Sequence, residues 1–351
     1  MKRVYVVIPS YEPDDRLLTL CDNLKKEKIK DVIIVNDGSS KKYSYIFKEI
    51  ENKYKFKILK HKVNMGKGRA LKTSFEYLME EDIVGCVTAD SDGQHSIKDI
   101  KKCMDALKNN PNSLILGCRD FTLDNIPPKS KFGNNLTRRV LRIFNGLKIS
   151  DTQTGLRGIP KSFMEYLLDV DGDRFEFETN MLIESKNKYP IVEVPIDTIY
   201  DSKENHSTHF NPIVDSYKIY RCIFGNFFRY LLSAVSSFAI DIVLFHLFCL
   251  VFKPVTSLFY ITIATVLARI VSSIYNYTLN HKFVFKSKEK QTVTAVKYLI
   301  LLVTQMFVSS FTVTVLSKLL VNISETIIKT FVDGILFIIN YIIQKKFIFK
   351  K

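Results

Sequence analysis

The sequence predicts an α/β domain with a mostly parallel sheet in residues 1–225, followed by an all-α domain of four transmembrane helices in residues 226–351. Short apolar runs alternate with helical patterns in the first part, and this alternation is typical of a parallel sheet with helices on both faces. After Arg229 the chain changes to long apolar runs separated by lysines. Such runs are long enough to cross the hydrocarbon core of a membrane.

Five short runs rich in β-type residues are expected as strands, at residues 4–9, 31–36, 56–60, 83–88 and 113–117. Helical patterns follow the first four of these runs, at residues 13–28, 41–53, 68–80 and 97–109. The turns after the first three strands carry polar residues, in the segments 9–12, 36–39 and 64–68.

Each of these turns alone is also compatible with a simple turn and helix cap. Gly66-Lys67-Gly68 is not a Walker A loop, because the spacing of that motif is absent. At one edge of one sheet, however, the turns together indicate a nucleotide-sugar site. The acidic turn after the second strand would hold a base or ribose, and Lys67 would meet a phosphate.

The segment 87–95, with the sequence VTADSDGQH, ends the fourth strand in Asp90, Asp92 and Gln94. Alternate residues of an extended segment point the same way, so these side chains are expected to converge. Their oxygen atoms suit a hard divalent cation, Mg²⁺ or Mn²⁺. A polar turn that caps the next helix is the alternative. An EF-hand is excluded, because Gly93 comes too early and Lys101 occupies the last ligand position.

The motifs IPSYEP, VNDGSS, NMGKGRAL and ADSDGQH resemble the successive motifs of family 2 glycosyltransferases with the GT-A fold. Within that family the chain is similar to the dolichyl-phosphate mannose synthase-like branch, through GCRDF, DTQTGLRG, RFEFETNML and HSTHFNP. The resemblance covers about residues 1–220. It implies a nucleotide-sugar donor and a polyprenyl-phosphate acceptor, either dolichyl or undecaprenyl phosphate.

The resemblance also implies roles for individual residues. Catalytic roles are expected for Asp92, Arg119, Asp151 and Arg157, with Arg119 facing the acceptor phosphate. Metal binding is expected from Asp90, Asp92 and Gln94. The other expected binding residues are Pro9, Tyr11, Glu12, Asp37, Gly66, Lys67, Asp90, Lys131, Asn134 and His209.

Two positions depart from the branch. Asn180 stands where an acidic residue is common, with Glu178 two residues earlier, and His209 stands where mannose synthases often have lysine. The second departure argues against GDP-mannose as the donor, although GDP-mannose and UDP-glucose types both remain open.

The expected chemistry needs no side chain as a base, since a lipid phosphate is already ionised at neutral pH. A metal would neutralise charge on the departing diphosphate, and the planar Arg119 guanidinium would clamp the acceptor phosphate. Alignment of the reactants can contribute about 7–11 kcal/mol. The expected outcome is inversion at the anomeric carbon.

A basic amphipathic helix is predicted at about residues 129–147. Its apolar residues are Phe132, Leu136, Val140, Ile143 and Leu147, with lysine and arginine elsewhere around it. Such a helix suits the surface of an anionic membrane, and packing on the core with a solvated basic face is the alternative. A second surface helix is predicted at about residues 211–228.

The four spans are expected at about residues 230–252, 258–279, 296–319 and 327–343. Lysine is abundant at residues 281–292 and 344–351, which the positive-inside rule places in the cytoplasm together with both termini and the catalytic domain. The six cysteines show no paired spacing, as expected of reduced thiols in that compartment. No signal peptide is expected at the start of the sequence.

The membrane part contains an internal repeat. The segments 274–277 and 282–285 recur as 339–341 and 346–349, and Arg229-Tyr230-Leu231 recurs as Lys297-Tyr298-Leu299. Residues 226–351 thereby resemble the GtrA family of four-helix membrane proteins, which is associated with polyprenyl-linked sugars. Asp241 and Arg269 are expected to pair within the membrane, either as a structural contact or as part of a polar path.

These observations favour a membrane-bound enzyme that makes a polyprenyl-phosphate sugar. The alternatives are a transporter of a polyprenyl-linked sugar, a glycosyltransferase with another acceptor, and a processive polysaccharide synthase. The last usually carries a QxxRW-type motif, and the chain has no tryptophan. The net charge of +15 is better explained by lipid headgroups than by nucleic acid, because no nucleic-acid-binding motif is present. The oligomeric state stays open, a homo-oligomer included.

Overall fold

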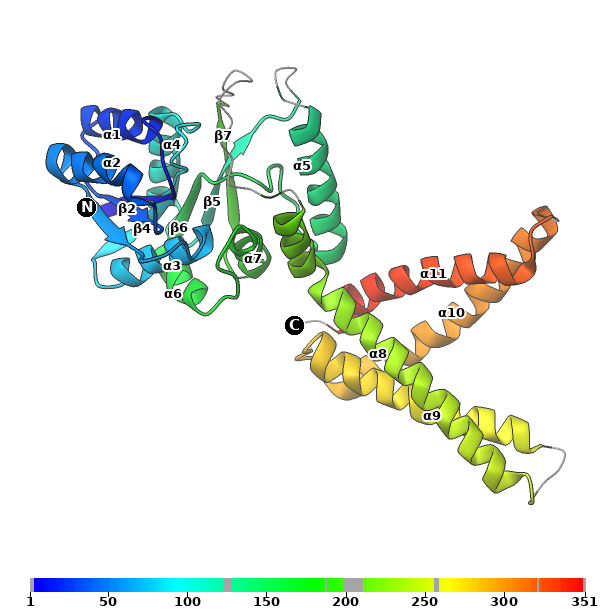
Figure 1. Ribbon diagram of the computed structural model, residues 1–351. Coiled ribbons are helices and arrows are strands. Elements are labelled where there is room, and N and C mark those ends of the chain that lie inside the picture. The colour runs from blue at the N-terminus through cyan, green and yellow to red at the C-terminus, as the bar shows by residue number, and fades with distance from the viewer. Residues whose placement is uncertain are drawn as a thin grey trace. The chain divides into compact units, whose positions relative to one another are not determined.

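The computed structural model describes residues 3–122, 126, 128–186, 188–197, 211, 213–255, 259–320 and 322–349, without the side chains of residues 129 and 325. The chain forms two compact units, Met1–Ile223 and Phe224–Lys351. Figure 1 shows the first as a sheet with helices and the second as long helices.

The first unit is built on a seven-stranded sheet with the strand order β3-β2-β1-β4-β6-β5-β7. Its strands are β1 (Arg3–Ser10), β2 (Val32–Asn36), β3 (Lys57–Lys60), β4 (Ile83–Thr88), β5 (Leu114–Arg119), β6 (Arg157–Pro160) and β7 (Ile191–Ile196). All pairings are parallel except those of β6, which runs antiparallel to both β4 and β5. The predicted α/β fold with a mostly parallel sheet is confirmed.

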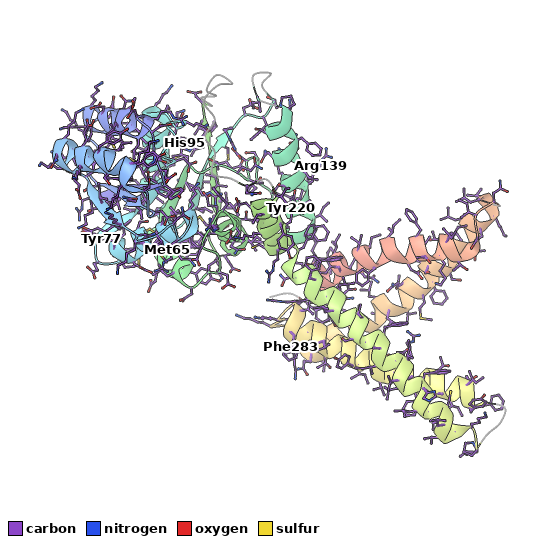
Figure 2. The ribbon with its side chains drawn as sticks, in the orientation of Figure 1. Met65, Tyr77, His95, Arg139, Tyr220 and Phe283 are labelled. Atoms are coloured by element: carbon purple, nitrogen blue, oxygen red, sulfur yellow. The ribbon has the colours of Figure 1, made fainter. Side chains whose placement is uncertain are left out.

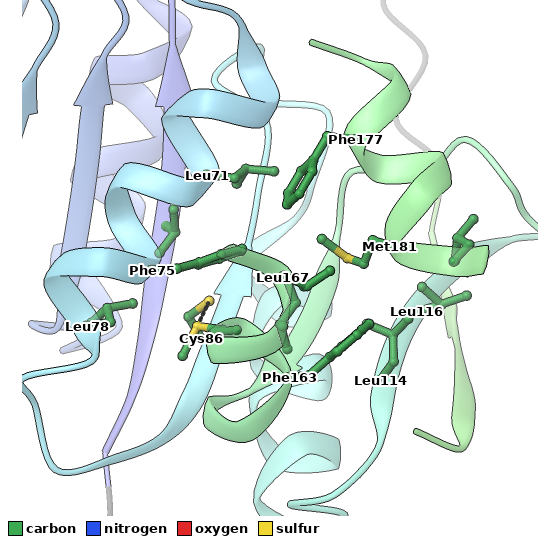
Figure 3. Packing of buried hydrophobic residues seen from close by; sticks show 14 of the residues in the cluster. Leu71, Phe75, Leu78, Cys86, Leu114, Leu116, Phe163, Leu167, Phe177 and Met181 are labelled. Atoms are coloured by element: carbon green, nitrogen blue, oxygen red, sulfur yellow. Dashed lines mark hydrogen bonds between the residues drawn. The ribbon is translucent and has the colours of Figure 1, made fainter. Parts of the chain in front are cut away.

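Helices cover both faces of this sheet. They are α1 (Arg16–Lys26), α2 (Ser44–Glu49), α3 (Lys67–Leu78), α4 (Ile97–Asn109), α5 (Pro128–Val140), α6 (Lys161–Leu168) and α7 (Glu176–Ser185). Because side chains alternate along a strand, Val4, Val6 and Ile8 of β1 pack with α1, α2 and α4. Tyr5 and Val7 face the other way, into the core that α3, α6 and α7 share. Figure 3 shows that second core, with Phe75, Phe163 and Phe177 among its residues.

The five predicted strands are present with ends shifted by at most a few residues, whereas β6, α6, α7 and β7 were not predicted. The sequence of β6 is RGIP, which has neither alternation nor length to mark a strand. Its place between β4 and β5 depends on tight packing, since a Cβ at Gly85 would overlap the carbonyl oxygen of Ile159. The predicted helix at 41–53 is a 3₁₀ turn, α2 and a π-helical turn in succession.

The second unit contains most of α8 (Val214–Phe252), with α9 (Tyr260–Leu279), α10 (Gln291–Leu319) and α11 (Glu325–Ile343). The predicted surface helix at 211–228 and the first predicted span are one continuous helix, α8, of 39 residues. Within the described part of the chain, three helices are long and apolar enough to cross a membrane, at Val214–Phe252, Gln291–Leu319 and Thr326–Ile348. Helix α9, at the second predicted span, carries Arg269 and several polar residues and is not among them.

Repeat-related side chains meet within the second unit. The hydroxyl of Tyr298 donates to Asn276 Oδ1 at 2.9 Å, and Asn280 Nδ2 donates to Gln344 Oε1 at 3.1 Å. Gln344 Nε2 in turn donates to the hydroxyl of Tyr230 at 3.3 Å. This chain of amides and hydroxyls joins the two hairpins.

The predicted pair of Asp241 and Arg269 is present, with Oδ2 and Nη2 3.4 Å apart. Ser272 Oγ donates to the other oxygen of Asp241 at 2.8 Å. Asp333 of α11 accepts from Ser309 Oγ and from Lys329 Nζ.

Candidate functional site

A cavity of about 1200 Å³ opens at the carboxyl ends of the parallel strands in the first unit. Ligands of open α/β sheets bind at this edge. Many of the residues predicted for the site line it, namely Pro9, Tyr11, Glu12, Asp37, Gly66, Lys67, Asp90, Asp92, Gln94 and Arg157. The structure thus brings residues of the three βα turns together around one cavity, and their binding of a ligand stays a prediction.

A charged cluster on the cavity wall joins α3, the end of β4 and α7. Lys67 Nζ lies 2.7 Å from Asp90 Oδ1 and 2.9 Å from Glu178 Oε2. His95 Nε2 approaches the second oxygen of Asp90 at 3.4 Å. A Cβ at Gly155 would overlap the Asp90 carboxylate, so this carboxylate packs directly against the glycine backbone.

Electrostatics within the cluster follow from these distances. Burial opposes the charge on Lys67, but Asp90 and Glu178 outweigh it and raise the pKa of the lysine. Burial likewise opposes ionisation of Asp90, yet Lys67 and His95 hold the pKa of Asp90 well below its usual range. Lys67 and Asp90 are therefore both charged at neutral pH.

Asp92 and Gln94 follow Asp90 in a turn rather than in an extended strand, and Gly93 takes a φ of +76°. The alternation argument therefore gives the wrong local geometry, although all three side chains reach the cavity. The backbone N–H of Gln94 donates to Asp92 Oδ1 at 3.1 Å. Burial and the Asp90 carboxylate raise the pKa of Asp92. Among the described residues, no three of His, Cys, Asp and Glu are placed to hold a metal by themselves.

Asp37 lines the cavity, but its carboxylate is engaged by the protein. Its Oδ1 accepts from the N–H of Met65 at 2.8 Å and lies 2.6 Å from His61 Nδ1. Its Oδ2 accepts from the N–H of Gly66 at 2.7 Å. The expected contact of Asp37 with a nucleotide stays a prediction, whereas its hold on the loop before α3 is part of the fold.

Gly66 begins α3 with a φ of +103°, a conformation that favours glycine. A Cβ there would overlap the carbonyl oxygen of Asp173, and one at Gly68 would lie 2.6 Å from the Cβ of Phe177. The two glycines thus allow α3 to pack against the segment that leads into α7. This packing brings Lys67 to Glu178.

Arg119 and Asp151 pair with each other and do not line the cavity. Arg119 Nε donates to Asp151 Oδ2 at 2.7 Å, and Nη2 donates to Oδ1 at 3.0 Å. Asp151 is completely buried and also accepts from the backbone N–H of Gln153. The geometry therefore gives this pair a part in holding the 151–153 loop, while the expected contact of Arg119 with a phosphate stays a prediction.

Asn134 and Lys131 of α5 also lie off the cavity wall. Asn134 is buried, accepts from the N–H and hydroxyl of Thr152, and donates to the carbonyl of Ser150 at 2.9 Å. These bonds tie α5 to the same loop. Lys131 is half-buried. His209 lies outside the described residues.

Arg157 reaches the cavity from β6 and is almost completely buried. Its Nε donates to the carbonyl of Thr154 at 2.9 Å, and Nη1 donates to the carbonyl of Glu178 at 2.6 Å. Burial lowers the pKa of Arg157. Arg157 therefore fixes the backbone on both sides of the charged cluster, next to Gly155 and at Glu178.

The sequence left open whether Glu178 or position 180 lines the cavity, and it did not predict Arg174. Glu178 is the carboxylate that faces the cavity, while Asn180 donates to the carbonyl of Asp171. Arg174, which is exposed, also lines the cavity from the start of α7. The FEFE segment itself was the available signal for Glu178, but no pattern marked Arg174.

Known proteins resemble both parts of the chain. Residues 5–168 match the model "Glycosyl transferase family 2", and residues 229–349 match "GtrA/DPMS, transmembrane domain". A protein of Methanococcus voltae named UDP-N-acetylglucosamine–dolichyl-phosphate N-acetylglucosaminyltransferase is 31% identical over 217 residues, which is 57% of this chain and 86% of that protein. The chain belongs to glycosyl transferase family 2.

This glycosyltransferase has further relatives at lower similarity. The dolichyl-phosphate β-glucosyltransferase of Saccharomyces cerevisiae is 28% identical over 221 residues, covering 54% of this chain and 65% of the yeast protein. A crystal structure of a mycobacterial protein superposes with a TM-score of 0.50 at 13% identity, covering 64% of this chain and 74% of that one. The structural likeness supports the fold alone.

Proposed function

We propose that this glycosyltransferase moves a sugar from a nucleotide sugar to a polyprenyl phosphate, giving a polyprenyl-phosphate sugar. The observation that carries the proposal is the match to 86% of the Methanococcus voltae enzyme, whose name includes dolichyl phosphate. The yeast relative is also named for dolichyl phosphate but for a different sugar. We therefore propose UDP-N-acetylglucosamine and UDP-glucose as the first donors to test, ahead of GDP-mannose.

The residues at the end of β4 suit a divalent cation. Asp90, Asp92 and Gln94 offer the oxygen atoms that Mg²⁺ and Mn²⁺ prefer, and all three line the cavity. Burial and the charged Asp90 raise the pKa of Asp92, and a cation bound beside both carboxylates would favour the ionised form of Asp92. When bound, the cation would neutralise charge on the departing nucleoside diphosphate.

In the proposed reaction an oxygen of the acceptor phosphate forms a bond to the anomeric carbon. The bond from that carbon to the donor diphosphate breaks, and its electron pair leaves with the diphosphate. In-line attack of this kind inverts the anomeric centre. The acceptor phosphate is already ionised, so the chain has to align the two reactants and stabilise charge.

The acceptor is proposed to enter between α5 and the start of α8. Gly133 and Thr137 of α5 line the cavity together with Ile219 and Tyr220 of α8. The hydroxyls of Thr137 and Tyr220 lie 3.5 Å apart, and Figure 2 labels Tyr220 on the first turns of α8. This end of the cavity offers hydroxyl groups and apolar surface, which suit a lipid phosphate and its first isoprene units.

The outer face of α5 supports a place at the membrane surface. Phe132 is 70% exposed, and Leu136 of α5 and Ile143 of the π-helical turn that follows it are exposed as well. Arg138 and Arg139 are exposed on the same helix. The opposite face of the helix packs on the domain, where Asn134 is buried, so the exposed apolar residues among arginines are left to fit an anionic membrane surface. We propose that this surface and the lysine-rich ends of the second unit face the cytoplasm.

A transfer assay with purified full-length protein in detergent tests the proposal. Labelled UDP-N-acetylglucosamine, UDP-glucose and GDP-mannose are offered separately with dolichyl or undecaprenyl phosphate and Mn²⁺ or Mg²⁺. We expect an organic-extractable product from one donor that disappears with EDTA. Absence of such a product from every donor, in protein with a cooperative thermal transition, would contradict the proposed function.

A further inference from the structure

The Asp90 carboxylate already has a cationic partner in the protein. Lys67 Nζ lies 2.7 Å from Asp90 Oδ1, and the lysine side chain is only 17% exposed. The other oxygen of Asp90 faces His95 Nε2 at 3.4 Å and the backbone of Gly155. A divalent cation that binds Asp90 at Oδ1 would therefore come within contact distance of a lysine ammonium, and the two positive charges would repel each other.

Of the groups around Asp90, Lys67 is the one with an alternative partner in the cluster. Its Nζ also lies 2.9 Å from Glu178 Oε2. Glu178 is held in place by its own backbone, because its carbonyl accepts from Arg157 Nη1 at 2.6 Å. The backbone at Gly155, which packs against Asp90, cannot move aside in the same way, because the buried Arg157 binds the neighbouring carbonyl of Thr154. The lysine can thus leave Asp90 while Glu178 retains it.

Resting on the function proposed above, we propose that Lys67 competes with the divalent cation for Asp90 and couples cation binding to binding of the nucleoside diphosphate. The diphosphate supplies a new anion for the ammonium, and Asp90 is then free to bind the cation. The cation and the nucleoside diphosphate consequently bind together far more tightly than the cation binds alone.

Mn²⁺ binding to the full-length protein in detergent tests this coupling without any turnover. The electron paramagnetic resonance signal of free Mn²⁺ is titrated with protein, in the absence and in the presence of UDP, and of GDP in a parallel series. In the wild type we expect weak binding of Mn²⁺ alone and much tighter binding with one nucleoside diphosphate. In Lys67→Met we expect Mn²⁺ alone to bind about tenfold more tightly or better, since the competing charge is gone.

Two further variants complete the test. One should change the affinity for Mn²⁺ in the opposite direction, and the other is a control that should leave it unchanged. Glu178→Gln removes the second carboxylate and leaves the ammonium to Asp90, so it should weaken binding of Mn²⁺ alone. Lys72→Met removes a buried lysine from the same helix, whose Nζ lies 3.8 Å from Asp173 and not beside Asp90. The charge of Lys72 is screened from the site at Asp90. The affinity of Lys72→Met for Mn²⁺ should therefore equal that of the wild type within about twofold.

The outcomes separate this inference from the proposed function. An unchanged or weaker affinity of Lys67→Met for Mn²⁺ alone, in protein that still binds Mn²⁺ with the nucleoside diphosphate, would overturn the competition and leave the function intact. Failure of the wild type to bind Mn²⁺ even with UDP or GDP would overturn both the competition and the metal site. The thermal transition of each variant excludes unfolding as the cause.

Discussion

Two clusters of opposite charges lie in the α/β unit, and they differ in access to the cavity. In the first, Lys67, Asp90 and Glu178 line the wall, with side-chain exposures of 17%, 30% and 12%. In the second, Arg119 binds a completely buried Asp151 and neither lines the wall. The first cluster can exchange a partner for a ligand, whereas the second holds a loop.

The partners of each carboxylate explain the difference. Asp151 accepts from two nitrogens of the Arg119 side chain and from the backbone N–H of Gln153, so its bonds define the shape of the chain. The partners of Asp90 are side chains, Lys67 and His95. We therefore expect the two carboxylates to have different roles, which mutation should separate.

The largest effect is expected from Asp151→Ala. Removal of one partner from a buried ion pair typically costs about 3–5 kcal/mol, and the N–H of Gln153 would lose its acceptor too. We expect a fall of this size in the free energy of unfolding, measured with urea in detergent. A variant as stable as the wild type but devoid of transfer activity would instead make Asp151 a catalytic residue.

Asp92→Asn should have the opposite effect, with unchanged stability and a large loss of transfer activity. The carboxylate is half-exposed on the cavity wall, and its raised pKa shows that the fold favours the neutral form. The neutral amide should therefore cost no stability, while transfer should fall by about 10²–10³-fold through loss of charge at the proposed metal site. The measurement is initial rates beside thermal transitions. Wild-type rates in this variant would remove Asp92 from the site.

Gly155→Ala should give a smaller effect on the same cluster. The new methyl group would overlap the Asp90 carboxylate, which supplies the three nearest atoms to it, and would displace that carboxylate. Displacement of a metal ligand by a supporting residue typically costs 10–100-fold in metal affinity or activity, and we expect about tenfold in transfer. A control away from the cavity is Gly334→Ala in α11, where none of the described residues places an atom within 4 Å of the new Cβ. Equal losses in the two variants would contradict a specific role of Gly155.

Much of the fold follows from the sequence because the central strands are buried on both faces and rich in Val and Ile. The ends of β1, β2 and β4 therefore predicted where the cavity opens. Strand β6 could not be found this way, because its pairing joins Thr88 to Arg157 across a long stretch of chain and depends on Gly85 and Gly158 for space.

The site was predictable where it depends on chain order and unpredictable where it depends on packing. Asp90 and Asp92 follow a strand and therefore reach the cavity. The engagement of Arg119 by Asp151 depends on β5 lying beside β6, and the bridge from Lys67 to Glu178 depends on α3 packing against α7. No local pattern encodes either contact.

Cys118 offers a sensitive probe of the structural cluster, since it precedes Arg119 in β5. Burial raises the pKa of Cys118 to about 12, so almost no thiolate forms below pH 9 and alkylation should be slow in the wild type, with a rate that still climbs at pH 9. In Asp151→Asn, which is milder than the alanine variant, loosening of the loop should expose the thiol. Its pKa would then move toward about 8.5, so labelling should be faster than in the wild type and should level off above that pH. Cys21 and Cys103 lie in the core on the opposite face and serve as controls, with burial likewise raising each pKa to about 12.

Mass spectrometry of labelled peptides reports all three thiols at once. Faster labelling of all three would indicate global unfolding, whereas labelling confined to Cys118 would show that Asp151 stabilises this edge of the sheet locally.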